Sequence, residues 1–93
     1  AASHGTLIGA ARDGVVVGAG WNGAYGKAVT IDHGDGYRTL YGHMSVIYAK
    51  SGQKVKAGKI IGRVGSTGLS TGPHLHFTLW HNGRLLNPMD ILW

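Results

Sequence analysis

The sequence predicts an all-β fold: a compact antiparallel sheet of barrel-like or sandwich-like form with short strands and glycine-rich turns. Glycine makes up 17 of the 93 residues and separates short runs rich in Val, Ile, Thr and Tyr. No segment carries the apolar stripe of an amphipathic helix. The length suits one small domain, and no stretch has the composition of a linker. Residues 1–93 are therefore assigned to a single domain.

The first half of the chain contains three predicted strands. Residues 14–19 form a buried strand, and residues 28–33 form the next one. The turn at 34–36 leads into a third strand at 37–43, because its two glycines supply the positive φ that a tight hairpin needs. Residues 45–50 are expected to hold a loop and a short strand.

The second half continues with turns and short strands. A turn unit at 53–58 precedes a strand at 59–64, and a polar loop occupies 66–72. Pro73 then leads into a further strand that contains a His-Leu-His sequence. The alternation of turn residues and β-branched residues supports each of these assignments.

The last part of the chain carries its strongest hairpin signal. Asn-Gly at 82–83 predicts a type I′ turn that pairs 79–81 with 84–86. Asn-Pro at 87–88 ends the second of these strands, because proline cannot donate to the ladder. The apolar tail at 89–93 is expected to pack on the sheet.

The charge is lopsided, with nine Lys and Arg against four acidic residues and a net charge of +5. Such a chain favours a polyanionic surface such as nucleic acid, anionic lipid or an anionic cell wall. The basic residues are scattered, and the one cluster, at 50–59, has no interleaved aromatic residues. Specific nucleic-acid binding is therefore not predicted. No stretch is long and apolar enough to be a transmembrane segment.

Several site classes are excluded by residue type. The chain has no cysteine, so it forms no disulfide and no thiolate site. The four aspartates form no convincing pair for glycoside hydrolysis, and Gly-x-Ser-x-Gly does not occur. The glycine-rich stretch at 62–68 lacks the Lys-Ser/Thr ending of a phosphate-binding loop.

His74 and His76 are the most informative pair. Side chains alternate along a strand, so these two imidazoles share one face about 7 Å apart. The opposite face of the same strand carries the apolar residues Leu75, Phe77 and Leu79, which are expected to face the core. The spacing suits a metal ligand beside a general base, since neutral imidazole serves in both roles.

The other histidines are open to two interpretations. His43 ends the third strand, and alternation puts it on the face of Thr39 and Tyr41. It is either a site residue, with Gly42 leaving room for a ligand, or a half-buried edge histidine. Histidines beside turns and near the N-terminus are expected to make local hydrogen bonds or to face water; these are His4, His33 and His81. Trp80 shares the face of His76 and is a candidate wall of a groove.

Residues 66–77, Ser-Thr-Gly-Leu-Ser-Thr-Gly-Pro-His-Leu-His-Phe, resemble the C-terminal signature of lysostaphin-type zinc metalloendopeptidases. The resemblance covers nearly the whole chain, in the order of that family, through segments 13–17, 32–37, 41–45, 52–58, 82–83 and 87–88. It implies a compact antiparallel β-fold with a groove that binds cross-bridges or stem peptides of peptidoglycan. It also implies a bacterial setting: an exported, cell-envelope or secreted protein, or a phage particle.

The resemblance implies roles for three histidines. His76, the second His of the His-x-His motif, matches a zinc ligand of the family. His74 matches the general base, and His43 matches the other catalytic histidine. A minor departure is Thr78, where the family often has Glu.

The family's other two zinc ligands come from an H-x-x-x-D motif, which this chain lacks. His4 is followed by Ile8 at the position of the Asp, and residues 5–11 resemble the segment after the motif. A catalytic zinc needs three protein ligands. We therefore expect these two ligands upstream of residue 1, in a domain that is incomplete at its N-terminus here.

Two alternatives remain open. One is a non-catalytic member of the same fold, which binds the cell wall or regulates another hydrolase and natively lacks H-x-x-x-D. The other is a sugar-phosphotransfer carrier or a lipoyl-like module, whose turn unit resembles residues 52–65. A lipoyl module needs a lysine at a hairpin tip, and none of the candidates has that setting: Lys27, Lys54, Lys56 and Lys59.

Overall fold

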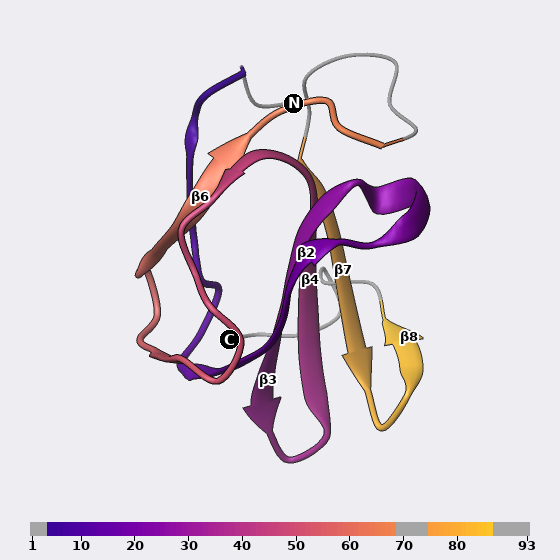
Figure 1. Ribbon diagram of the computed structural model, residues 1–93. Helices are drawn as coiled ribbons and strands as arrows, with labels where there is room; N and C mark the ends of the chain where they lie inside the picture. Colours follow the sequence, from indigo (N-terminus) through magenta and orange to yellow (C-terminus); the bar gives the residue numbers. More distant parts are fainter. Residues whose placement is uncertain (1–3, 69–74, 87–93) are drawn as a thin grey trace.

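The computed structural model describes residues 4–68 and 75–86, and every strand in this part pairs antiparallel within one sheet (Figure 1). A single 3-10 turn, η1 (Gly23–Tyr25), is its only helical element. In the described residues, no helix is long and apolar enough to cross a membrane. The strands are β1 (Leu7–Gly9), β2 (Gly14–Trp21), β3 (Lys27–Gly34), β4 (Tyr37–Ile47), β5 (Lys54–Val55), β6 (Ile60–Val64), β7 (His76–His81) and β8 (Arg84–Leu86).

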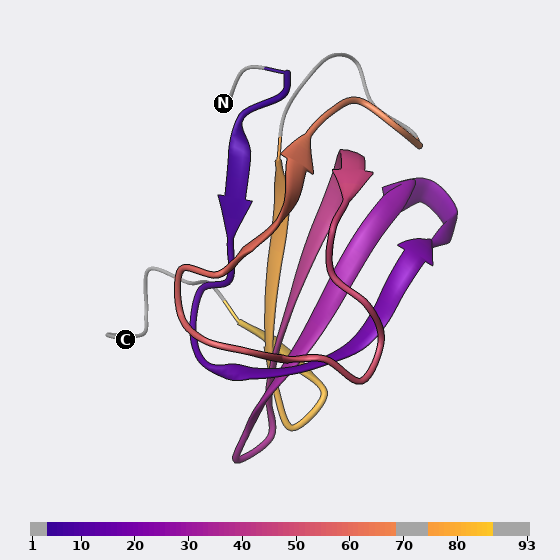
Figure 2. The same ribbon diagram turned by 60° about the vertical axis from the view of Figure 1, so that its left-hand side comes forward.

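The long strand β4 organises the sheet. The strand order is β1-β6-β4-β3-β2-β5, and β7 also pairs with β4 and carries β8 on its other edge. One edge of β4 is shared, because β7 pairs with its residues 37–42 and β6 with its residues 44–47. The sheet therefore divides beside His43, and it curls into a half-barrel (Figure 2). The predicted all-β, antiparallel fold is confirmed.

The core fills the inside of this curl. Its fully buried side chains come from the middle of β2, β3, β4 and β6, and they include Val16, Val29, Ile31, Tyr41, Met44, Ile61 and Val64. Leu75 and Phe77 pack against this cluster, and Leu79 is buried. The predicted alternation along β7, with these three residues facing the core, is confirmed.

Most predicted strands are present, with three differences. The turn at 82–83 is confirmed as type I′, since Asn82 and Gly83 have φ of 52° and 79°. However, β4 continues to Ile47 rather than ending at residue 43, and β2 continues to Trp21. Strand β1 was not predicted, because three residues are too few to show a period. The predictions for Pro73 and for the tail at 89–93 lie outside the described residues.

His33 belongs to a polar network on the core side of the sheet. Its Nδ1 donates to the Asp13 carbonyl at 2.9 Å, and its Nε2 lies 2.6 Å from Thr39 Oγ1. Thr39 in turn contacts the Tyr41 hydroxyl at 2.8 Å, and the Ala11 N–H donates to that hydroxyl. Burial raises the pKa of Tyr41. His33 makes hydrogen bonds, but its partners lie 20 and 6 residues away along the chain, so these are not the local bonds expected of it.

The Asp13 carboxylate ties the start of β2 to the segment after β5. Its Oδ1 accepts the Ala57 N–H at 2.8 Å, and Lys56 Nζ lies 3.8 Å from Oδ2. The hydrogen bond from Ala57 holds the pKa of Asp13 below its ordinary value, and the charge of Lys56 adds to this effect. A depressed folded-state pKa stabilises the fold above the unfolded pKa, and this contribution is lost as pH falls through the folded pKa.

We therefore expect Asp13→Asn to lower Tm at neutral pH, with the difference from wild type shrinking as pH falls below about 4. Thermal unfolding followed by circular dichroism across pH 2–7 measures this. Asp35→Asn is the matched control, because Asp35 is exposed in a turn and its φ of 52° is one that asparagine tolerates. A Tm difference for Asp13→Asn that stays constant over the whole range would contradict the assigned role.

Candidate active site

A β-bulge turns His43 away from the core. Val29 pairs with Tyr41 and Lys27 with Met44. The β4 segment between these two pairs is therefore one residue longer than the β3 segment opposite it. His43 absorbs the extra residue with a left-handed φ of 57°. Strict alternation put His43 on the face of Thr39 and Tyr41, and that prediction is wrong. Bulges re-aim side chains in this way, and here the ring of His43 lies 5.8 Å from that of His76.

His43 is held firmly in this position. Its Nδ1 lies 2.7 Å from the Thr67 carbonyl oxygen, which can only accept, so Nδ1 carries a proton. In the neutral ring, this places the lone pair on Nε2. The side chain is 6% exposed, and β4 is paired along both edges. The alternative of a half-buried edge histidine is therefore wrong.

His76 stands opposite Gly42 in the β4–β7 register. A Cβ at Gly42 would lie 3.4 Å from the His76 Cβ and 3.3 Å from the Tyr25 Cβ, so the glycine leaves both side chains their space. The Tyr25 and His76 rings are 4.9 Å apart. The His76 Nε2 lies 2.8 Å from Thr78 Oγ1, and Thr78 is buried. The buried Thr78 hydroxyl therefore supports the imidazole directly.

Thr67 connects three segments around the two histidines. Its carbonyl oxygen accepts from His43, while its Oγ1 accepts from the Lys27 N–H at 3.0 Å and donates to the Met44 carbonyl at 2.7 Å. The side chain thereby bridges the first residue of β3 and the bulge of β4. Sequence reasoning placed Thr67 only in a polar loop and missed this role.

The Thr67 segment also packs against the loop that carries Tyr25. A Cβ on Gly26 would lie 2.6 Å from the Thr67 carbonyl oxygen, and a Cβ on Gly68 would lie 2.5 Å from the Ala24 carbonyl oxygen. Both glycines have positive φ, of 65° and 75°. The two backbone segments can approach this closely because both contact positions are glycines, which have no side chain. The sequence signal for this close approach was one glycine in each of two separate stretches. The sequence alone does not show that these two glycines meet.

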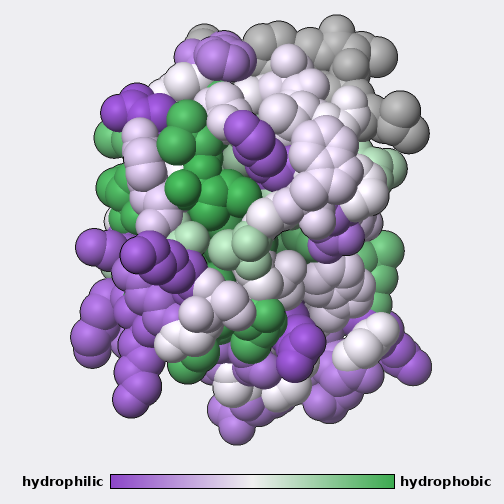
Figure 3. All heavy atoms as spheres, in the orientation of Figure 1, coloured by the Kyte–Doolittle hydropathy of each residue, from purple (hydrophilic) through white to green (hydrophobic). Residues whose placement is uncertain are grey.

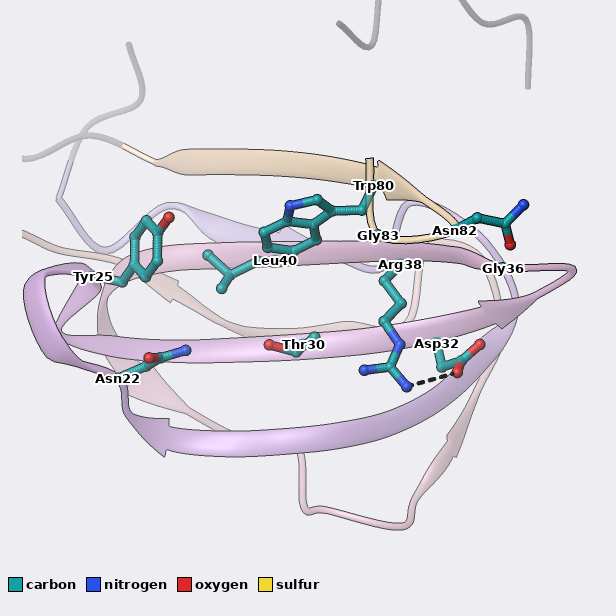
Figure 4. Close-up of a pocket in the computed structure, with 10 residues that line it drawn as sticks. All are labelled: Asn22, Tyr25, Thr30, Asp32, Gly36, Arg38, Leu40, Trp80, Asn82 and Gly83. Carbon is teal, nitrogen blue, oxygen red and sulfur yellow. Dashed lines mark ion pairs between the residues drawn. The ribbon is translucent and has the colours of Figure 1, made fainter. Parts of the chain in front are cut away.

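A groove extends from His76 along the outer face of the sheet. A hollow of about 440 Å³ is lined by His76, Thr78 and the β8 side chains Leu85 and Leu86. A second hollow of about 600 Å³ lies along β3, β4 and β7 (Figure 4), and Tyr25 and Trp80 line both. The two hollows adjoin at these side chains on one face of the sheet and are together called the groove, and Trp80 is one of its walls, as predicted.

The lysine cluster at 50–59 and two of the other histidines lie away from the groove. The lysines of the 50–59 cluster are exposed and line neither hollow, and hydrophilic side chains gather at the lower left of the surface in Figure 3. His81 stacks on Tyr37 at 4.1 Å, and His4 is exposed. The structure thus brings together His43 and His76, whereas His74 lies outside the described residues.

The described residues do not complete a catalytic zinc site. Within 4–68 and 75–86, no three His, Cys, Asp or Glu side chains are grouped so that they could hold a metal ion. A catalytic zinc site takes three protein ligands. His76 supplies at most one of them, so a zinc centre needs ligands from other residues.

Known proteins match the chain along its length. The sequence profile of Peptidase family M23 matches residues 1–88. Peptidoglycan DD-endopeptidase ShyA of Vibrio cholerae is 47% identical over 85 residues, which are 91% of this chain and 20% of ShyA. The chain spans about a fifth of the length of the curated relatives it matches.

Solved structures agree with this match. The catalytic domain of the antimicrobial peptidase lysostaphin from Staphylococcus simulans superposes with a TM-score of 0.88 at 40% identity, covering 96% of this chain and 71% of that one. A zinc-containing peptidase from Vibrio cholerae superposes with a TM-score of 0.85 at 36% identity, covering 88% of this chain and 25% of that one.

Proposed function

The chain belongs to Peptidase family M23, and on this premise we propose that it is part of a zinc-dependent endopeptidase that cleaves cross-bridges or stem peptides of bacterial peptidoglycan. The observation that carries the proposal is the bulge that turns His43 toward His76 at the end of a long groove. The relative ShyA, named as a peptidoglycan endopeptidase, supports the substrate class.

The proposed roles follow the geometry of the groove. An extended peptide lies along the outer face of the sheet, between Trp80 and Tyr25. His43, oriented by Thr67, donates to or accepts from the reacting peptide group once the peptide is bound. His74 is proposed as the general base because it is the first His of His-x-His, which matches the general base of the family.

The metal is proposed to bind through His76 and through two ligands that this sequence does not contain. A zinc ion, when bound, supplies a Lewis acid at the scissile carbonyl. Residues 1–93 are thus proposed as the larger part of a domain whose remaining ligands lie upstream.

We propose that the protein works at the cell wall, as an exported, envelope-associated or secreted protein or as part of a phage particle. A net charge of +5 suits an anionic wall. A non-catalytic wall-binding role is the second candidate. A natural N-terminus that lacks H-x-x-x-D would decide for this candidate.

The substitution His43→Asn, made in the full-length protein, tests the proposal. Asparagine tolerates the left-handed φ of this position, so the fold is retained while the imidazole is lost. We expect cleavage of purified peptidoglycan to fall at least about 100-fold, the usual scale for a proton-transfer or oxyanion group. Mass spectrometry of the released peptides counts new amino and carboxyl termini.

His81→Asn is the matched control, since His81 lies on the opposite face of β7 from His76. Undiminished cleavage by His43→Asn would contradict the catalytic role of His43. Peptidoglycan binding without new termini, by the wild-type protein, would decide for the non-catalytic candidate.

A further inference from the structure

We propose that Arg38, oriented by Asp32, determines specificity by binding a free carboxylate of the substrate peptide, about 13 Å along the groove from His76. This inference rests on the proposed function. The substrate would need a free carboxylate in a part of the groove that neither His43 nor His76 lines.

The charged pair is built into the floor of the groove. Asp32 and Arg38 are register partners on β3 and β4, and Arg38 Nη2 lies 3.3 Å from Asp32 Oδ2. The other carboxylate oxygen of Asp32 accepts the Gly34 N–H at 2.9 Å, which fixes the carboxylate. Figure 4 shows the Arg38 side chain lying across the floor toward Asp32, with Trp80 above it on the neighbouring strand.

Arg38 keeps donor capacity for a ligand. Guanidinium has five N–H donors in a planar fork that matches a carboxylate. Among the described residues, Asp32 is its one ion-pair partner, through a single nitrogen. The Arg38 side chain is 54% exposed, so this pair contributes little stability and shifts readily. A substrate carboxylate can therefore be bound without breaking a strong interaction.

The distance follows from the strand register. Arg38 pairs with Trp80, and Gly42 pairs with His76, four residues further along both strands. A strand rises about 3.3 Å per residue, so the two pairs are about 13 Å apart. A peptide extended along the sheet with its scissile bond at His76 reaches Arg38 with about its fourth residue. The carboxylate is either the chain terminus or an acidic side chain at that distance.

The surroundings strengthen the expected interaction. Trp80 and Leu40 line the groove beside Arg38, and a bound peptide would cover the guanidinium between them, which lowers the local dielectric for the charge pair. Asp32 repels an incoming carboxylate, but its two oxygens already accept from Gly34 and Arg38. Its effect is to point the guanidinium along the floor, which makes it a positioning residue.

The test compares how fast the full-length protein cleaves matched synthetic peptides. One pair differs only in a C-terminal carboxylate or carboxamide about four residues from the cleaved bond, and a second pair places an acidic side chain or its amide there. We expect wild type to prefer the free acid by about 10-fold or more in kcat/KM in at least one pair. We expect Arg38→Gln to abolish this preference while the amides are still cleaved.

Two variants separate recognition from structure. Lys56→Gln removes the same charge from an exposed ion pair outside the groove and is expected to keep the preference. The exchange Asp32→Arg with Arg38→Asp keeps an ion pair but moves the positive charge to β3, and is expected to lose the preference.

The outcomes distinguish this inference from the function on which it rests. A wild-type protein that cleaves none of the four peptides and no peptidoglycan would overturn the proposed function. Equal cleavage of acids and amides by wild type would overturn the carboxylate site alone. The carboxylate site would also be overturned if Arg38→Gln slowed acid and amide equally, or if the exchanged pair kept the preference.

Discussion

Replacing His76 with alanine is expected to lower peptidoglycan cleavage by the encoded protein at least about 100-fold and to reduce its zinc content. Loss of groups that merely support a metal ligand already costs about 10- to 100-fold, so loss of the ligand itself is expected to cost more. His76 lies at the end of the groove opposite Gly42, and its ring contacts those of Tyr25 and His43.

Zinc is measured by mass spectrometry of the purified protein, and cleavage by the release of new peptide termini. His81→Ala is the matched control, because it removes an imidazole from the same strand on the opposite face. His76→Ala with unchanged zinc and unchanged cleavage would show that the assignment of His76 is wrong. Lost cleavage with zinc retained would point instead to a role for His76 in proton transfer.

Gly26→Ala is expected to have the second large effect, on both stability and activity. The added Cβ would meet the Thr67 carbonyl oxygen at 2.6 Å, and alanine would have to adopt a φ of 65°. Gly26 combines this φ with a ψ of −137°, a conformation essentially confined to glycine, and the backbone strain and the forced shift together cost about 2–5 kcal/mol. Because Thr67 holds His43, its displacement is expected to reduce cleavage by about 100-fold in the fraction that still folds.

Gly23→Ala is the control for a positive φ without the close contact. Gly23 has a similar φ of 52°, but a Cβ there meets no atom within 4 Å. We expect Gly23→Ala to lower the free energy of unfolding only by the cost of a positive φ, about 1–2 kcal/mol, and to leave activity nearly unchanged. Denaturant unfolding gives both stabilities. Equal losses in the two variants would show that the close approach to Thr67 has no functional consequence.

Much of the sheet was predictable because its causes are local. The Asn82-Gly83 turn needs positive φ at two consecutive residues, and few other pairs supply it. The faces of β7 follow from a period of two, which correctly placed Leu75 and Phe77 toward the core and Trp80 toward the groove. The family was predicted from motifs along nearly the whole chain and is confirmed.

The candidate site was less predictable because its causes are not local. The orientation of His43 depends on a bulge, and a bulge arises from the mismatch between β4 and its partners rather than from β4 alone. Thr67 acts on Lys27, His43 and Met44, which lie 23 to 40 residues away along the chain. No pattern within one segment indicates such contacts.

The sequence alone thus determined the fold class, the two faces of β7 and the identity of the imidazoles, since these depend on composition, turn chemistry and spacing. Only the tertiary structure decided that His43 faces His76, that Tyr25 and Thr67 enclose them, and that Asp32 and Arg38 lie in the same groove. The physical reason is that pairing register and backbone close approach are properties of two segments at once, and a linear pattern describes one segment at a time.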